Sequence, residues 1–113
     1  MASIKPRLLL VDDDPSLLRL LTLRLEGEGY QVLNADSAEA ALPVLAKNSV
    51  DVVLSDLRMP GLDGMSLFDE VAKRYPGLPV VLMTAHGSIP EAVAATQRGV
   101  FGFLTKPLNN VEL

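Results

Sequence analysis

The sequence predicts an α/β domain in which a doubly wound, five-stranded parallel sheet is covered by helices on both faces. Short apolar runs alternate with stretches of helical periodicity, and this alternation is typical of βαβ units. Several of the runs are apolar without a break, as in strands that are buried on both faces. At 113 residues and 49% hydrophobic content, the chain can bury one core, so we expect a single domain over 1–113.

The five expected strands are short apolar runs that recur along the whole chain. They occupy residues 7–11, 31–35, 51–55, 79–84 and 101–105. The first, third and fourth of these runs are continuously apolar, which indicates strands covered on both faces.

Helices are expected between the strands, where apolar residues recur at helical spacing. The ranges are 15–28, 37–47, 65–75 and 89–98. Asp14 is placed to cap the first helix, with Pro15 at the first helical position. Ser88 and Glu91 form the pattern of a capping box, and Gly99 is a helix stop.

Two features depart from a regular α/β pattern. Pro43 falls inside the second helical range, where an interior proline costs ~3 kcal/mol, so we expect that helix to be distorted or shortened. The chain ends in "PLNNVEL", where Asn109 or Asn110 is a candidate N-cap. A helix of about 11 residues would run past Leu113, so we expect a truncated fifth helix and a longer parent protein.

The composition excludes several classes of function. The absence of cysteine excludes disulfides and thiolate metal sites, and it suits the cytoplasm, where we expect the protein to be. We see no signal peptide, and the apolar runs are far shorter than the roughly 18 residues of a membrane span. A net charge of −4 argues against nucleic-acid binding by this domain and fits the attraction of a cation.

Charged and polar side chains follow four of the predicted strands, at the point where each strand ends. Asp12 and Asp13 follow the first strand, and Asp56 follows the third. Thr84 closes the fourth strand and Lys106 follows the fifth. Because ligands of open parallel sheets bind outside the carboxyl ends of the strands, we expect these side chains to converge on one edge.

Clustered carboxylates repel one another and therefore favour a bound cation. With oxygen ligands, no cysteine and a single histidine, the cluster favours Mg²⁺ or Mn²⁺ over zinc. Such a cation, together with Lys106 and the Thr84 hydroxyl, would form a cradle for a phosphoryl group. Asp56, which precedes the turn "LRMPG", is placed to accept that group, as carboxylates do in aspartyl-phosphate enzymes.

Four segments of the sequence resemble a known family. "LVDDD", "LSDLRMPGLDGM", "LMTAHGS" and "FLTKP" are similar to motifs of the receiver domain of two-component response regulators. The resemblance covers essentially the whole chain, with every motif in order. It implies the flavodoxin-like or CheY-like fold with strand order 2-1-3-4-5, and it implies that Asp56 is the phosphoacceptor.

The resemblance also implies which residues hold the metal ion. Asp13, Asp56 and the backbone carbonyl of Arg58 would ligate Mg²⁺ directly. Asp12 would act on the ion mainly through water, whereas Asp14 caps the first helix.

Further residues are implied to bind the phosphoryl group or to respond to it. Thr84, the backbone of Ala85 and Lys106 would bind the group, and the bond between Lys106 and Pro107 would be cis. Thr84 and Phe103 would act as the switch pair. His86 and the Arg58 side chain would lie at the rim, where His86 would tune the phosphoryl lifetime.

The family resemblance implies a signalling function rather than turnover of a substrate. The phosphoryl donor would be a phosphohistidine on a sensor histidine kinase, and autodephosphorylation would be the only other reaction. Residues 84–107 are similar to receivers of the NtrC group, which control sigma-54-dependent transcription. In that group an AAA+ ATPase and a helix-turn-helix domain follow the receiver, and we expect homodimerisation on phosphorylation.

Two other functions are compatible with the residues. A metal-dependent phosphatase of the haloacid-dehalogenase type uses a D-x-D pattern, which Asp12 and Asp14 match. Its chain is usually longer, and it carries a later acidic pair that we do not find. A receiver-like docking module without phosphorylation is the third reading, and a failure to bind Mg²⁺ would favour it.

Overall fold

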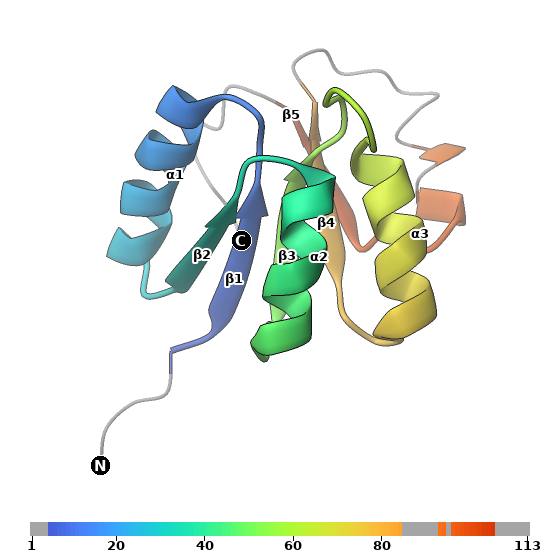
Figure 1. Ribbon diagram of the computed structural model, residues 1–113, viewed down its shortest axis with the longest axis horizontal. Coiled ribbons are helices and arrows are strands. Elements are labelled where there is room, and N and C mark those ends of the chain that lie inside the picture. The colour runs from blue at the N-terminus through green and yellow to red at the C-terminus, as the bar shows by residue number, and fades with distance from the viewer. Residues whose placement is uncertain (1–4, 85–92, 95, 106–113) are drawn as a thin grey trace.

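The fold is a five-stranded parallel sheet between two layers of helices, as expected. The computed structural model describes residues 5–84, 93–94 and 96–105. The strand order is β2-β1-β3-β4-β5, which confirms the predicted topology (Figure 1). The strands are β1 (Arg7–Val11), β2 (Gln31–Ala35), β3 (Val52–Asp56), β4 (Val80–Thr84) and β5 (Gly102–Thr105).

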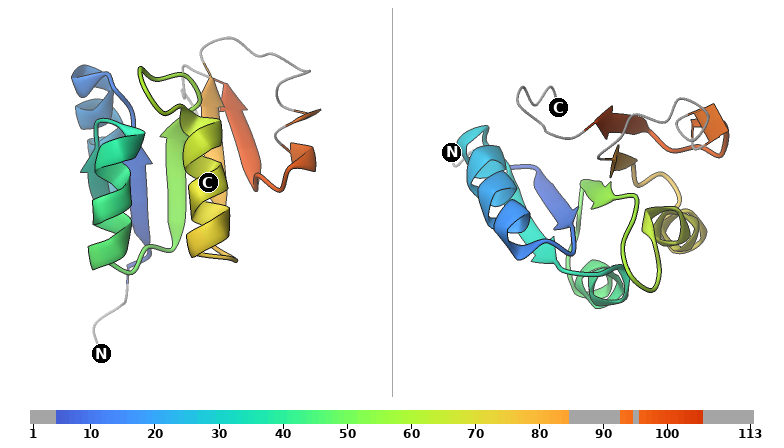
Figure 2. Two further views of the ribbon diagram at one scale, coloured as in Figure 1. Left: turned by 45° about the vertical axis from the view of Figure 1, so that its right-hand side comes forward. Right: turned by 90° about the horizontal axis from the view of Figure 1, so that it is seen from above.

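Helices cover both faces of the sheet. The elements are α1 (Pro15–Gly27), α2 (Ala38–Lys47) and α3 (Gly64–Arg74). Seen from above, α1 lies on one face while α2 and α3 lie on the other (Figure 2). This arrangement explains why the central strands lack alternation: both of their faces are buried.

The helix boundaries predicted from caps and stops are confirmed where they are described. The Asp14 side chain accepts hydrogen bonds from the backbone N–H groups of Ser16 (3.0 Å) and Leu17 (3.3 Å), as an N-cap does. Residues 93–94 and 96–97 are helical, and Gly99 follows them with a φ of +109°. The predicted Ser88–Glu91 capping box and the fifth helix fall outside the described residues.

Two apolar clusters hold the layers together, one on each face. On the α1 face, Leu21 and Leu25 pack with Leu54 and Met83 of the sheet. On the opposite face, residues of α2 and α3 pack against alternate positions of the same strands, such as Val53 and Leu82. Leucine and valine side chains buried in this way stabilise a fold by about 1.5–3 kcal/mol each. The clusters therefore fix the strand ends on which the site depends.

The second helix is longer than expected from its proline. It runs without interruption from Ala38 to Lys47, so the predicted shortening is wrong, while the alternative, a distortion at Pro43, stays a prediction. Three buried side chains of α2, Ala38, Ala41 and Leu45, anchor it on the sheet, and this packing outweighs the poor helix propensity of one residue. Pro43 itself is exposed and has no N–H to donate toward the carbonyl of Glu39.

The helices in the described ranges do not combine the length and apolar character that a crossing of a lipid bilayer requires.

Replacing Pro43 with alanine should stabilise the protein by about 1–2 kcal/mol. The substitution removes an interior-proline penalty of ~3 kcal/mol, partly offset by a more flexible unfolded chain. Urea denaturation followed by circular dichroism measures the effect. Pro15→Ala is the matched control, because proline at the first helical position lacks no intrahelical bond, and it should not stabilise. A Pro43→Ala protein no more stable than wild type would contradict this account of α2.

Candidate functional site

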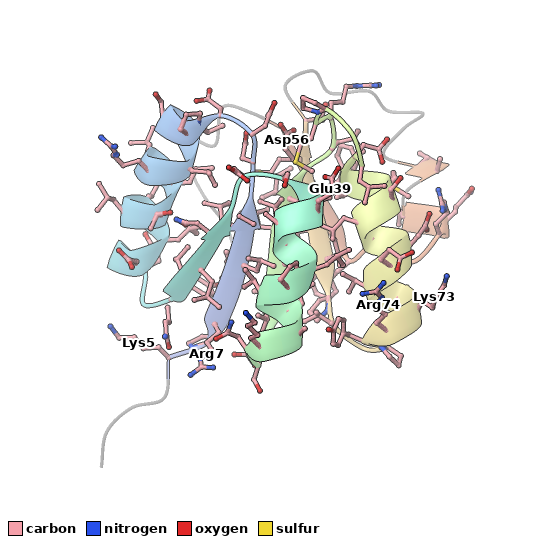
Figure 3. The ribbon with its side chains drawn as sticks, in the orientation of Figure 1. Lys5, Arg7, Glu39, Asp56, Lys73 and Arg74 are labelled. Atoms are coloured by element: carbon pink, nitrogen blue, oxygen red, sulfur yellow. The ribbon has the colours of Figure 1, made fainter. Side chains whose placement is uncertain are left out.

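The parallel register brings the ends of β1, β3 and β4 to the same level. Val11, the last residue of β1, pairs with Ser55, and Asp56 pairs with Met83 of β4. Asp12 therefore leaves β1 beside Asp56, and Thr84 ends β4 at the same edge. Figure 3 shows Asp56 at this carboxyl edge, far from Lys5 and Arg7 at the opposite end of the strands. The predicted convergence at one edge follows from this register.

Three carboxylates meet at that edge. Asp12, Asp13 and Asp56 each offer an oxygen, and these oxygens lie within 4.8 Å of one another. Asp12 is fully buried and Asp56 is 8% exposed, whereas Asp13 is exposed to solvent. All donors are carboxylate oxygens, which hard divalent cations such as Mg²⁺ prefer. The described residues thus supply a fitting site for such an ion.

Backbone hydrogen bonds fix the direction of the first acidic segment. The N–H of Asp12 donates to the carbonyl of Ala35 (3.2 Å), which extends the β1–β2 pairing by one residue. The N–H of Asp14 donates to Oδ1 of Asp12 (2.9 Å), so one carboxylate oxygen of Asp12 is already oriented. The carboxylate of Asp14 instead accepts hydrogen bonds from the first turn of α1, so Asp14 caps that helix and is not part of the acidic cluster.

Other predicted site residues are placed as follows. Thr84 is 5% exposed at the end of β4, and Arg58 is exposed two residues after Asp56. Phe103 is half-buried and packs against the cluster on the α2–α3 face. The remaining predicted residues, Ala85, His86, Lys106 and Pro107, lie outside the described residues.

Sequence reasoning missed features of the loop that follows Asp56. Asp63 caps α3 by accepting from the N–H of Ser66 (2.9 Å), and the N–H of Gly64 donates to the carbonyl of Leu57 (2.8 Å). Ser55, directly before Asp56, donates its hydroxyl to the Asp56 carbonyl (3.0 Å). A serine inside an otherwise apolar strand was the one sequence signal that could have pointed to this arrangement.

The fold and the acidic edge define a class of protein, and comparison with known proteins agrees with it. The chain matches the response regulator receiver domain family over residues 8–113. It therefore belongs to the family of response regulator receiver domains, as the motifs predicted.

The transcriptional regulatory protein GlrR of Escherichia coli (strain K12) is 62% identical to this chain over 108 residues, which are 95% of the chain and 24% of GlrR. This match and the next one confirm the predicted similarity to receivers of NtrC-type regulators. The DNA-binding transcriptional regulator NtrC of Klebsiella pneumoniae is 42% identical over 100 residues, covering 88% of the chain and 21% of NtrC. The chain thus spans about a quarter of the length of the curated relatives that it matches.

A solved structure supports the same fold. The response regulator protein TrrA of Thermotoga maritima, determined in complex with Mg²⁺ and BeF, has a TM-score of 0.83 with 29% sequence identity. The match covers 92% of this chain and 89% of TrrA.

Without a divalent cation, Asp13→Asn should raise the free energy of unfolding by about 2 kcal/mol, because Asp13 belongs to two of the three carboxylate pairs. The substitution removes one of three negative charges held within 4.8 Å of one another, and repulsion at this distance costs about 1 kcal/mol per pair in water. Urea denaturation in EDTA measures the change. Glu26→Gln on the exposed face of α1 is a control for the change in net charge. An Asp13→Asn protein that is less stable than this control would show that the carboxylates do not repel.

Proposed function

We propose that Asp56 accepts a phosphoryl group from a phosphohistidine of a sensor histidine kinase. The observation that supports this role is the clustering of its carboxylate with those of Asp12 and Asp13 at the carboxyl edge of the sheet. Asp56 is the member of the cluster that precedes the β3–α3 loop, and its 8% exposure still leaves it a route to an incoming donor.

The metal ion proposed for this edge is Mg²⁺, with Mn²⁺ as an expected substitute. Asp13, Asp56 and the Arg58 carbonyl would bind it directly, and Asp12 would act mainly through water. When bound, Mg²⁺ neutralises charge on the oxygens of the phosphoryl group in transfer. Three carboxylate oxygens within 4.8 Å support the assignment, because carboxylate oxygens are the ligands that hard divalent cations prefer.

In the proposed transfer, a carboxylate oxygen of Asp56 attacks the phosphorus atom of the phosphohistidine. A P–O bond forms and the P–N bond breaks, and its electron pair stays on the departing imidazole nitrogen, which takes up a proton. The product is an acyl phosphate on Asp56. Thr84, the Ala85 backbone and Lys106, which precedes the cis bond to Pro107, would bind its oxygens. His86 and Arg58 would border the site, and autodephosphorylation would be the only further reaction.

The proposed switch runs from Asp56 to the β4–β5 side of the sheet. Thr84 would move toward the phosphoryl group, and Phe103 would turn inward in response. The half-buried position of Phe103 on the α2–α3 face supports this, because such a ring can gain further burial. The changed surface would promote homodimerisation of the receiver, while this domain makes no direct contact with nucleic acid.

The output proposed for the whole protein is control of sigma-54-dependent transcription. It rests on similarity to NtrC-type regulators, from which we infer an AAA+ ATPase and a helix-turn-helix domain outside this receiver. The phosphatase alternative is disfavoured because Asp14, the second acid of its D-x-D pattern, is engaged as the α1 cap. The docking-module alternative is disfavoured by the intact acidic cluster.

Asp56→Asn should abolish phosphorylation by acetyl phosphate, because an amide oxygen is a poor nucleophile. Intact-protein mass spectrometry after incubation with acetyl phosphate and MgCl₂ measures the incorporation. Asp69→Asn, an exposed residue of α3, is the matched control and should be labelled as wild type. Full incorporation into Asp56→Asn would overturn the assignment, and phosphate found on Asp12 would revive the phosphatase reading.

Labelling should also depend on a divalent cation held by the acidic cluster. EDTA should stop labelling of the wild type, and MgCl₂ or MnCl₂ should restore it. For Asp13→Asn, the Mg²⁺ concentration needed for half-maximal labelling should rise about tenfold or more, since loss of one metal ligand costs over 1.4 kcal/mol. An unchanged Mg²⁺ requirement in Asp13→Asn would place the ion elsewhere, and metal-independent labelling would remove it from the mechanism.

A further inference from the structure

The backbone carbonyl of Asp56 is in close contact with two residues that have no assigned role. The hydroxyl of Ser55 donates a hydrogen bond to the Asp56 carbonyl oxygen (3.0 Å). Gly64 approaches so closely that a Cβ added to it would overlap the same oxygen. The carbonyl is therefore restrained by a hydrogen bond and by close packing.

Ser55 is an unusual residue for its position. The interior positions of β1, β3 and β4, strands that are described in full, are otherwise apolar. Ser55 is completely buried, and its register partners Val11 and Leu82 are both 0% exposed. A buried hydroxyl in apolar surroundings is costly unless it finds a partner, and the Ser55 hydroxyl donates to the carbonyl of Asp56.

Gly64 is required by space rather than by backbone conformation. It is the first residue of α3, and it is not among the glycines with positive φ. A Cβ at this position would also lie 2.9 Å from the Cα of Leu57. Because both obstacles are backbone atoms of β3 and its following loop, alanine could fit only if α3 or the Asp56 backbone moved.

We infer that Ser55 and Gly64 are positioning residues that fix the Asp56 carboxylate relative to those of Asp12 and Asp13. This inference rests on the proposed function of Asp56 as phosphoacceptor. A carboxylate must meet both the metal ion and the phosphorus atom, and small displacements of such groups are costly in rate. Restraint of the Asp56 main chain next to its own Cα limits the directions that its side chain can take.

The test removes a hydroxyl group at Ser55 and, as a control, at Thr22, and it measures the labelling rate and the Mg²⁺ requirement of each variant. Ser55→Ala should lower the initial rate of labelling by acetyl phosphate about three- to tenfold, the range set by loss of one hydrogen bond. The Mg²⁺ concentration for half-maximal labelling should rise about two- to fivefold, because Asp56 is also a proposed metal ligand. Thr22→Val is the control: it removes a hydroxyl that bonds the Asn34 side chain between α1 and β2, and both parameters should stay at wild-type values.

Two further variants and one control separate an effect on Asp56 from a general loss of stability. Ser55→Thr retains the donor and should recover at least about half of the lost rate. Gly64→Ala should slow labelling at least as much as Ser55→Ala. In contrast, Gly27→Ala in α1, where a Cβ meets no atom within 4 Å, should label normally.

Labelling rates and Mg²⁺ requirements of Ser55→Ala and Gly64→Ala that equal those of their controls would overturn the inference. Asp56→Asn, assayed in the same experiment, separates the two failures. If it still incorporates phosphate, the proposed function itself is wrong. If it does not, and Ser55→Ala labels normally, only the positioning role is wrong.

Discussion

The structure depends on one constraint: parallel strands deliver acidic side chains from distant parts of the sequence to a single edge. The pairing of Val11 with Ser55 places Asp12 and Asp56 beside each other although 43 residues separate them along the chain. The carboxylates of the cluster repel one another, by about 1 kcal/mol or more for each pair of charges at this separation. The two apolar clusters of the sheet hold the strand ends in this arrangement against that repulsion.

Hydrogen bonds that involve the main chain restrain two of the acids in the cluster, Asp12 and Asp56. The N–H of Asp14 donates to Asp12, so a backbone group sets the direction of a buried carboxylate. At Asp56 the relation is reversed, because a side chain restrains the backbone carbonyl. Both hydrogen bonds join residues that are one or two positions apart in the sequence. The orientation of each acid is therefore set largely by residues near its own strand end, and the sheet brings the strand ends together.

Most of the fold and the acids of the site could be predicted from the sequence, because they follow from apolar periodicity and from the charged or turn residues that end each element. Strand limits agreed within about one residue, since apolar runs end at charged residues or turns. Pro43 misled the prediction because propensity is local, whereas the burial of Ala41 and Leu45 that sustains α2 is tertiary. The acids of the site were found because they follow strand ends. Ser55 and Gly64 could not be predicted in the same way. Ser55 acts through a hydrogen bond to the Asp56 carbonyl and Gly64 through its close approach to the same group, and neither contact produces a periodic pattern in the sequence.

The same local geometry connects the acidic edge to the parts of the fold that would respond to it. The N–H of Leu57 donates to the carbonyl of Met83 (2.8 Å), one residue before Thr84, so the main chain after Asp56 is bonded directly to the end of β4. Leu57 also accepts from the N–H of Gly64, which begins α3. A shift of the Asp56 backbone would therefore displace β4 and α3 together, because both are attached to the residue that follows it. Because the interior is closely packed, these hydrogen-bonded contacts transmit small displacements. A small shift at the Asp56 carboxylate would therefore be enough to move both β4 and α3.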